Sequence, residues 1–308
     1  MKIIIGSSTF ADEDKTPLRL LEQAGVEFML NPLGRRWNEE ETIRHLAGVD
    51  GLLAGLEPLT RRVMESTGGR LKAIARIGIG MNNVDQAAAR DLGIKVSNTP
   101  DGPTEAVAEM TLAALLSLAR DLEGMNRAMH AGQWPKQISR SLGELAVLVV
   151  GYGRIGRRTA RRLADAGCTI CVHDPYLPAG TPCEFARVSL DEGLAKADVV
   201  SLHASGAQPI LTDREFALVR PGVILLNPSR GELVDEAALL RALDAGRVGK
   251  AWFDAFWREP YDGVLKNYPQ VLLTPHACTY TRRCRREMES EAVQNLLRDL
   301  GVGGNPSA

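Results

Sequence analysis

The sequence predicts an α/β protein made of two doubly wound parallel-sheet domains. Three observations lead to this prediction. Short apolar runs alternate with stretches of helical spacing along most of the chain. A glycine-rich turn, Gly151–Gly156, stands between a strand-like run and a helix-like run. The chain has 308 residues, which is enough for two domains with separate hydrophobic cores.

The first domain begins at the N-terminus and ends near Asn98. Apolar runs predict its strands at 2–6, 26–30, 51–55, 71–77 and 94–97. Helical spacing predicts the helices between them at 17–24, 36–46, 61–65 and 84–91. Because strands and helices alternate at this spacing, we expect a parallel sheet with helices on both faces.

A long helix follows this domain. Proline is favoured at the first position of a helix, so Pro103 predicts the start of one that runs to Arg120. From Ala106 to Ala119 apolar residues occupy nearly every face, which predicts burial all round, either between domains or in a subunit interface. A more polar helix is expected at 121–132.

The second domain continues the alternation from Leu145. Its strands are predicted at 147–150, 169–173, 199–203, 223–227, 250–254 and 271–274. Helices are predicted after Gly156 and at 190–197, 213–219 and 235–245, and an amphipathic helix at 282–300 closes the chain.

The turn Gly151-Tyr-Gly153-Arg-Ile-Gly156 has the spacing of a dinucleotide-binding loop. Its glycines allow a tight turn, room for a pyrophosphate and close packing of helix on strand, and the helix N-terminus offers free N–H groups to phosphates. Asp174 ends the next strand, where a carboxylate should meet the ribose hydroxyls. Because this carboxylate would repel a 2′-phosphate and no arginine follows it, the sequence favours NAD over NADP.

Composition and charge exclude several kinds of protein. Charged residues make up 24% of the chain and the formal net charge is −1, so no overall basic field favours nucleic acid or membrane binding. The N-terminus lacks the apolar run of a signal peptide, and no run is long enough to span a membrane. Five cysteines at 168, 171, 183, 278 and 284 predict neither a disulfide framework nor a metal site. We expect a cytoplasmic protein.

Three predicted strands of the second domain are followed by ionisable residues: Arg230, Glu259 and His276. In open α/β sheets ligands bind beyond the carboxyl ends of the strands, so these side chains are expected to converge at the cofactor. Arginine can clamp a carboxylate with two parallel N–H bonds, and histidine can exchange a proton with a carbonyl oxygen. A carboxylate beside a histidine orients the ring and favours its protonated form. The three residues therefore predict a catalytic site.

The chain resembles the D-isomer-specific 2-hydroxyacid dehydrogenases, and within them the phosphoglycerate dehydrogenase-like branch. The resemblance runs from about Gly51 to about Leu300. It rests on the motifs at 76–85, 98–100, 151–156, 227–231, 254–260 and 274–276. It implies an NAD-dependent enzyme that interconverts a 2-keto acid and a D-2-hydroxy acid and forms a homodimer through the cofactor domain.

The resemblance also implies a domain layout and roles for particular residues. A flavodoxin-like substrate domain would comprise 1–98 and 280–308, a Rossmann NAD-binding domain would comprise 99–279, and the crevice between them would close by a hinge motion. His276 would be the acid/base, Glu259 its partner and Arg230 the residue that binds the substrate carboxylate. The backbone of Gly78, Ile79 and Gly80 would bind the same carboxylate from the substrate domain.

For the cofactor, the resemblance implies pyrophosphate contacts from Arg154 and Ile155, a ribose contact from Asp174 and a nicotinamide contact from Asp254. Ala204 and Pro228 would line the cofactor.

Departures from the family leave the substrate open. Phosphoglycerate dehydrogenases usually carry an Arg-Ser pair after the strand that here leads into Gly55-Leu56-Glu57, so a phosphate there is in doubt, although Arg76 could compensate. Phosphorylated or phosphonate substrates therefore stay as alternatives to plain keto acids. Because NAD(H)-sensing corepressors of the family keep the same three residues, a non-catalytic sensor is the alternative from another class.

Overall fold

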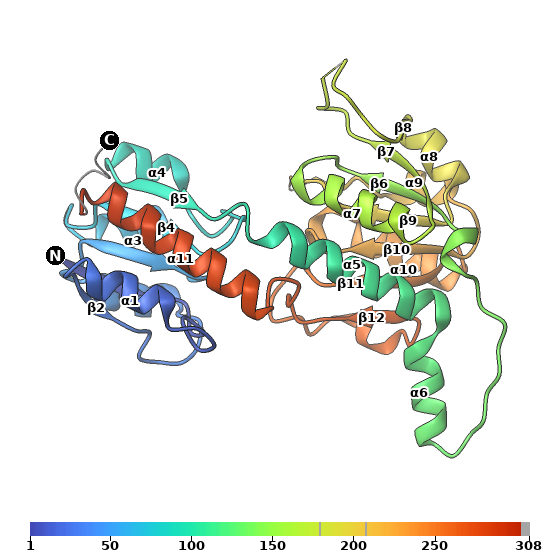
Figure 1. The fold of residues 1–308 in the computed structure, drawn as a ribbon, viewed down its shortest axis with the longest axis horizontal. Coiled ribbons are helices and arrows are strands. Elements are labelled where there is room, and N and C mark those ends of the chain that lie inside the picture. The colour runs from blue at the N-terminus through green and yellow to red at the C-terminus, as the bar shows by residue number, and fades with distance from the viewer. Residues whose placement is uncertain (179, 207, 303–308) are drawn as a thin grey trace. The chain divides into compact units, whose positions relative to one another are not determined.

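The structure is a computed structural model that describes residues 1–178, 180–206 and 208–302. It divides into two compact units, Met1–Pro103 with the segment from Thr279 onward, and Thr104–Cys278 (Figure 1). These limits lie near the predicted boundaries at 98/99 and 279/280.

The first unit is built on a five-stranded parallel sheet of order β2-β1-β3-β4-β5. The strands are β1 Lys2–Ile5, β2 Glu27–Met29, β3 Gly51–Ala54, β4 Ala73–Arg76 and β5 Lys95–Asn98. The helices are α1 Thr16–Gln23, α2 Glu39–Leu46, α3 Arg61–Glu65, α4 Gln86–Asp91 and α11 Arg282–Asp299. Each predicted element of this unit is present, with its ends shifted by a few residues at most.

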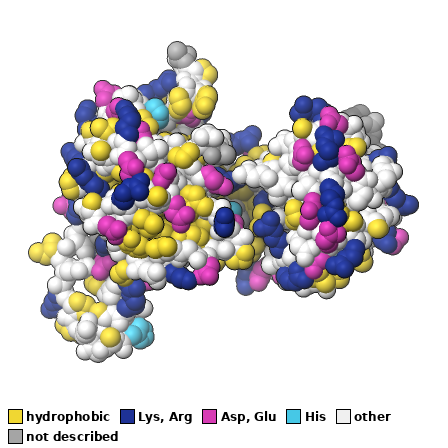
Figure 2. Space-filling model, turned by 180° about the vertical axis from the view of Figure 1, so that it is seen from behind, with side chains coloured by type: hydrophobic (Ala, Val, Ile, Leu, Met, Phe, Trp, Pro, Cys, Tyr) yellow, Lys and Arg dark blue, Asp and Glu magenta, His cyan; other side chains and the backbone are white. Residues whose placement is uncertain are grey.

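The C-terminal helix α11 belongs to the first unit although 183 residues, 99–281, separate it from β5. It contacts α1 and lies along β3, β4 and β5 (Figure 1, red). Its buried face includes Met288, Ala292, Val293 and Leu296. On the face of this unit seen in Figure 2, Lys and Arg side chains are interleaved with Asp and Glu, so that face carries no extended field of one sign.

The second unit is built on a seven-stranded parallel sheet of order β12-β11-β10-β9-β6-β7-β8. The strands are β6 Ala146–Val150, β7 Thr169–His173, β8 Ala186–Arg187, β9 Val199–Leu202, β10 Val223–Asn227, β11 Val248–Phe253 and β12 Val271–Leu273. The helices are α5 Pro103–Arg120, α6 Leu122–His130, α7 Arg154–Asp165, α8 Leu190–Lys196, α9 Asp213–Leu218 and α10 Glu236–Asp244, with 3-10 turns η1 Leu142–Glu144, η2 Gly231–Leu233 and η3 Val264–Asn267. The two-residue edge strand β8 was not predicted.

Two hydrophobic clusters cover the faces of this sheet. One includes Leu148, Leu202, Leu225 and Phe253, and the other includes Val147, Val149, Leu226 and Trp252. Neighbouring residues of one strand fall into different clusters because successive side chains of a strand point to opposite faces. A sheet covered on both faces explains why its strands are continuous apolar runs.

Helix α5 is only partly buried within a single chain, and its predicted burial in a subunit interface stays a prediction. Ala108 and Leu115 are fully buried, but Glu109 and Ala113 are exposed and 38% of Leu116 is accessible. These positions are three or four residues apart, so they form one exposed stripe along the helix. The apolar composition of α5 is therefore only partly explained by packing within the chain. Among the described residues, no helix has the length and apolar character to cross a membrane.

Candidate active site

The glycine loop joins β6 to α7, and close contacts explain two of its glycines. A methyl group added at Gly151, whose φ is +91°, would lie 2.6 Å from the backbone nitrogen of Ala204, and one at Gly156 would lie 1.9 Å from the carbonyl oxygen of Gly151. Gly153 begins α7 and faces open space. Because Gly153 has no side chain, the N-terminus of α7 stays accessible to a phosphate, with Arg154 and Ile155 in the first turn. The loop fits a dinucleotide.

Asp174, just beyond β7, lies against this loop. Its Oδ2 accepts a hydrogen bond from the backbone N–H of Tyr152 at 2.8 Å, and its Oδ1 accepts one from Tyr176 at 2.9 Å. A carboxylate has further lone pairs for ribose hydroxyls. The position of Asp174 beside the loop fits an adenosine ribose and leaves a negative charge where a 2′-phosphate would have to bind.

The three predicted catalytic residues follow β10, β11 and β12, which are neighbours in the sheet. Asn227, the last residue of β10, holds the turn that carries Arg230: its amide donates to the Arg230 carbonyl at 2.7 Å and its Oδ1 accepts from the Ser229 N–H at 3.1 Å. Arg230 Nη1 donates to the Ser229 carbonyl at 2.6 Å. Because β10 to β12 are parallel and adjacent, the three side chains start from one edge of the sheet.

Glu259 and His276 form a hydrogen-bonded pair. Both carboxylate oxygens of Glu259 lie 2.9 Å from His276 Nδ1, and Oε1 also accepts the N–H of Phe256 at 3.1 Å. Burial by itself would raise the pKa of Glu259, but the hydrogen bond and charge of His276 outweigh it, and the pKa lies below its usual value. With Nδ1 facing the carboxylate, Nε2 is the nitrogen left to exchange a proton with a substrate.

Asp254 fixes the turn that carries His276. It is fully buried, and its Oδ1 accepts from the Thr274 hydroxyl at 2.5 Å and from the Ala277 N–H at 2.9 Å, while Oδ2 accepts from the Cys278 N–H at 3.0 Å. His276 itself has a φ of +52°, which is uncommon for a residue other than glycine. These bonds hold the turn in that conformation. Sequence reasoning missed this role, and the expected nicotinamide contact of Asp254 stays a prediction.

The segment after β9 packs directly on the glycine loop. The backbone of Ala204 makes the close approach to Gly151, and Ser229, next to the buried Pro228, donates to the Leu202 carbonyl at 2.7 Å. His203 contacts Ser201 Oγ through Nε2 at 2.8 Å, and burial lowers its pKa to about 3, so it is neutral. Ala204 and Pro228 thus lie on elements beside the glycine loop, while His203 has a structural position.

The predicted carboxylate-binding loop, Gly78–Gly80, belongs to the first unit and follows β4. The N–H of Gly78 donates to Thr99 Oγ1 at 2.7 Å, and Asn98 Nδ2 donates to the Ile79 carbonyl at 2.9 Å. Gly78 has a φ of +128°, and a methyl group there would overlap the guanidinium of Arg76. The loop is therefore fastened to the end of β5, and Arg76 lies over it.

The cysteines do not form a metal site in the described part of the chain. All five are free thiols, and no group of three or more His, Cys, Asp or Glu side chains there could hold an ion. Burial raises the pKa of Cys168 to about 11 and raises that of Cys171, which keeps both as thiols. Thiols, unlike thiolates, are poor nucleophiles and metal ligands.

Comparison with known proteins identifies the family and the cofactor. Residues 112–278 match the family described as D-isomer specific 2-hydroxyacid dehydrogenase, NAD binding domain, so the cofactor is NAD. The chain is 37% identical over 252 residues to D-3-phosphoglycerate dehydrogenase 2 of Arabidopsis thaliana, covering 78% of this chain and 40% of that protein. It thus spans about two-fifths of the length of this larger relative.

Two further proteins match over nearly their whole length. The hydroxypyruvate reductase of Thermotoga maritima is 31% identical, with 86% of this chain and 89% of the reductase aligned. A crystal structure of a Thermus thermophilus protein superposes with a TM-score of 0.90 at 32% identity, covering 100% of this chain and 99% of the other. The chain belongs to the D-isomer-specific 2-hydroxyacid dehydrogenase family, in its phosphoglycerate dehydrogenase-like branch.

Proposed function

We propose that the protein is an NAD-dependent dehydrogenase that interconverts a 2-keto acid and the corresponding D-2-hydroxy acid. The observation that carries the proposal is the Glu259–His276 pair, 2.9 Å apart, at the carboxyl edge of a sheet whose glycine loop fits a dinucleotide. A titratable pair at such an edge is the arrangement that a proton-coupled hydride transfer requires.

Each side chain has a distinct task in the proposed reaction. Bound NADH supplies the hydride that reduces the keto carbon. Arg230 binds the substrate carboxylate and keto oxygen and so orients the carbon that reacts. His276 donates its Nε2 proton to the developing alkoxide, and Glu259 stabilises the protonated ring through Nδ1. In the reverse direction His276 accepts the hydroxyl proton.

Residues 1–98 and 280–308 are proposed as the substrate domain, and 99–279 as the NAD-binding domain. The loop Gly78–Gly80 of the substrate domain would bind the substrate carboxylate through the backbone N–H groups of Ile79 and Gly80, because that of Gly78 donates to Thr99, and Arg76 would add a positive charge. Support comes from the position of the loop at the carboxyl edge of the parallel sheet, where such ligands bind.

The variant His276→Ala tests the proposal. We expect kcat with the best 2-keto acid to fall by about a thousandfold or more, because the acid/base is lost, while the Kd for NADH changes little. NADH oxidation is followed by absorbance with glyoxylate, hydroxypyruvate, phosphohydroxypyruvate and phosphonopyruvate. Wild-type kcat in the variant would remove His276 from the reaction. NADH binding without turnover of any substrate would instead favour the sensor.

A homodimer is proposed as the assembled form. Apolar side chains remain exposed along α5, α6 and the segment that follows, with 38% of Leu116, 52% of Leu122, 47% of Met129 and 75% of Trp134 accessible. A second copy covering this face would explain the apolar exposed stripe of α5. Light scattering should give twice the chain mass.

A cytoplasmic location is proposed because free cysteines suit a reducing compartment.

A further inference from the structure

A buried carboxylate, Glu57, lies at the carboxyl edge of the five-stranded sheet. It follows β3 and is only 1% exposed. Strands β1, β3 and β4 are parallel neighbours, so Gly6, Glu57 and Gly78 follow the ends of adjacent strands on the same edge. This edge carries the loop to which we assign the substrate carboxylate. The inference below therefore rests on the proposed function and narrows its substrate.

The backbone around Glu57 leaves space for its carboxylate. The side chain folds back over its own turn, and the Gly55 N–H donates to both oxygens at 3.1 Å. A methyl group at Gly6 would lie 2.0 Å from Oε1, and one at Gly55 would lie 3.1 Å from Oε2. The carboxylate therefore occupies the space above the end of β1 that these glycines leave open.

Two arginines act on this carboxylate. Burial raises the pKa of Glu57 to about 6, although the Gly55 N–H and the charges of Arg76 and Arg36 oppose the rise. Arg76 comes from β4 and lies over Gly78, and its Nη1 donates to the Ile77 carbonyl. Arg36 comes from the segment before α2.

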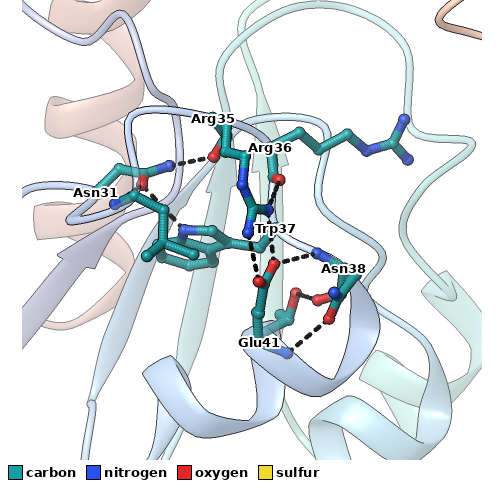
Figure 3. A network of polar contacts seen from close by, with 8 residues as sticks. Asn31, Arg35, Arg36, Trp37, Asn38 and Glu41 are labelled. Atoms are coloured by element: carbon teal, nitrogen blue, oxygen red, sulfur yellow. Dashed lines mark hydrogen bonds and ion pairs between the residues drawn. The ribbon is translucent and has the colours of Figure 1, made fainter.

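A polar network fixes the segment that carries Arg36 (Figure 3). Asn31 Nδ2 donates to the Gly6 carbonyl at 2.6 Å, and Trp37 Nε1 donates to Asn31 Oδ1 at 3.0 Å. The guanidinium of Arg36 extends away from this network (Figure 3). The segment is thus tied to the end of β1, directly beside the space that Glu57 fills.

We propose that Glu57 determines substrate specificity by excluding keto acids that carry a second anionic group, such as a phosphate or sulfonate. With Glu57 ionised, its negative charge offsets part of the positive charge that Arg76 and Arg36 bring to this edge. The positive charge that remains suits the one carboxylate of a plain keto acid. A phosphate on the distal carbon adds negative charge beside a desolvated carboxylate, where repulsion is weakly screened. The substrate is a 2-keto acid with an uncharged tail.

The proposal predicts a difference in pH dependence between substrates. A phosphorylated substrate is accommodated only when Glu57 holds a proton, so its KM rises as the pH increases above about 6. The KM for hydroxypyruvate rises less, because its tail carries no charge and only its carboxylate is repelled. If Glu57 had a purely structural role, the pH dependence of KM would be the same for both substrates.

The experiment compares hydroxypyruvate with 3-phosphohydroxypyruvate in the wild type, Glu57→Gln and the control Glu215→Gln. Glu215 is another buried carboxylate, in the second unit, paired with Arg214 at 2.7 Å. We expect the wild type to favour hydroxypyruvate in kcat/KM. Glu57→Gln should reduce that preference by about tenfold or more and reduce the pH dependence of KM for the phosphorylated substrate. Glu215→Gln should keep the wild-type ratio.

A binding measurement separates failure of this inference from failure of the proposed function. Calorimetry on the NADH-loaded His276→Ala protein, with and without Glu57→Gln, measures the Kd of each of the two ligands. The ratio of these two Kd values gives the preference between the ligands without turnover. If neither substrate is reduced, the dehydrogenase proposal fails, and this binding ratio still decides the role of Glu57. The Glu57 proposal is overturned by a ratio that Glu57→Gln leaves unchanged, by a wild-type preference for the phosphorylated ligand, or by no binding of either ligand.

Discussion

Two glutamates that follow strand ends differ in their protonation. Glu259, beyond β11, has a side chain that is 27% exposed and bonds to His276, and its pKa is lowered. Glu57, beyond β3, is 1% exposed, and burial raises its pKa to about 6. Burial raises the pKa of both groups. What differs is whether a cationic partner lies within hydrogen-bond distance, as His276 does for Glu259.

This difference gives the two carboxylates different chemical uses. Glu259 stays charged over the whole range in which an imidazole titrates, so it can stabilise a protonated His276. Glu57 changes its charge close to neutral pH and so responds to other charges that enter its surroundings. Glu259 is therefore suited to a constant role beside an acid/base, and Glu57 is suited to discriminating between substrates of different charge.

The largest effect is expected for Glu259→Gln. The neutral amide cannot stabilise the protonated histidine, so kcat should fall by about a hundredfold, with little change in the Kd for NADH. Steady-state kinetics as a function of pH measure this. Glu236→Gln, which alters a carboxylate bonded to Tyr261 at 3.2 Å in the same unit, serves as the control. An unaltered pH profile in Glu259→Gln would show that the pair does not act as a unit.

Glu57→Gln should change the pH dependence of stability. Since the folded-state pKa is raised from 4.5 to about 6, the unfolded chain releases the proton first, and the folded chain loses stability as the pH rises between these values. Relative to the wild type, the variant should gain about 2 kcal/mol in the free energy of unfolding between pH 4.5 and about pH 7. Urea unfolding at several pH values measures the difference. A constant difference across the range would contradict the raised pKa.

The smallest effect is expected for Asp174→Ala. This third strand-end carboxylate bonds to backbone N–H groups of Tyr152 and Tyr176, and we expect it to bind the ribose as well. Its loss should raise the Kd for NADH by about tenfold and weaken discrimination against NADPH, because one hydrogen-bonding charge is removed. Fluorescence titration with both cofactors measures this. Equal affinities in wild type and variant would place the ribose elsewhere.

Most of the fold could be predicted because the local signals agree with the final structure. The strand Val223–Asn227 and the helix Arg61–Glu65 were predicted with the observed ends. The edge strand Ala186–Arg187 was missed because two polar or small residues carry no periodic signal. The exposed stripe of α5 was missed because composition alone does not tell which partner covers an apolar helix.

The pairing of Glu259 with His276 could be anticipated because both residues follow strands that are neighbours in a parallel sheet. The roles of Asp254 and Glu57 could not. Asp254 accepts from consecutive backbone N–H groups, whose directions depend on the left-handed conformation of His276. Glu57 turns back over its own backbone, and this reversal depends on empty space at Gly6, a residue far away in the sequence.

The space over Gly6 that the Glu57 carboxylate occupies links the substitutions that positions 6 and 57 can accept. A chain that gained a side chain at position 6 first would force the carboxylate out of its buried position, since the new methyl group would lie 2.0 Å from Oε1. A chain that shortened Glu57 first would leave a cavity that a larger residue at position 6 could then fill. A larger residue at position 6 therefore leaves the buried carboxylate undisturbed only where the side chain at position 57 is shorter.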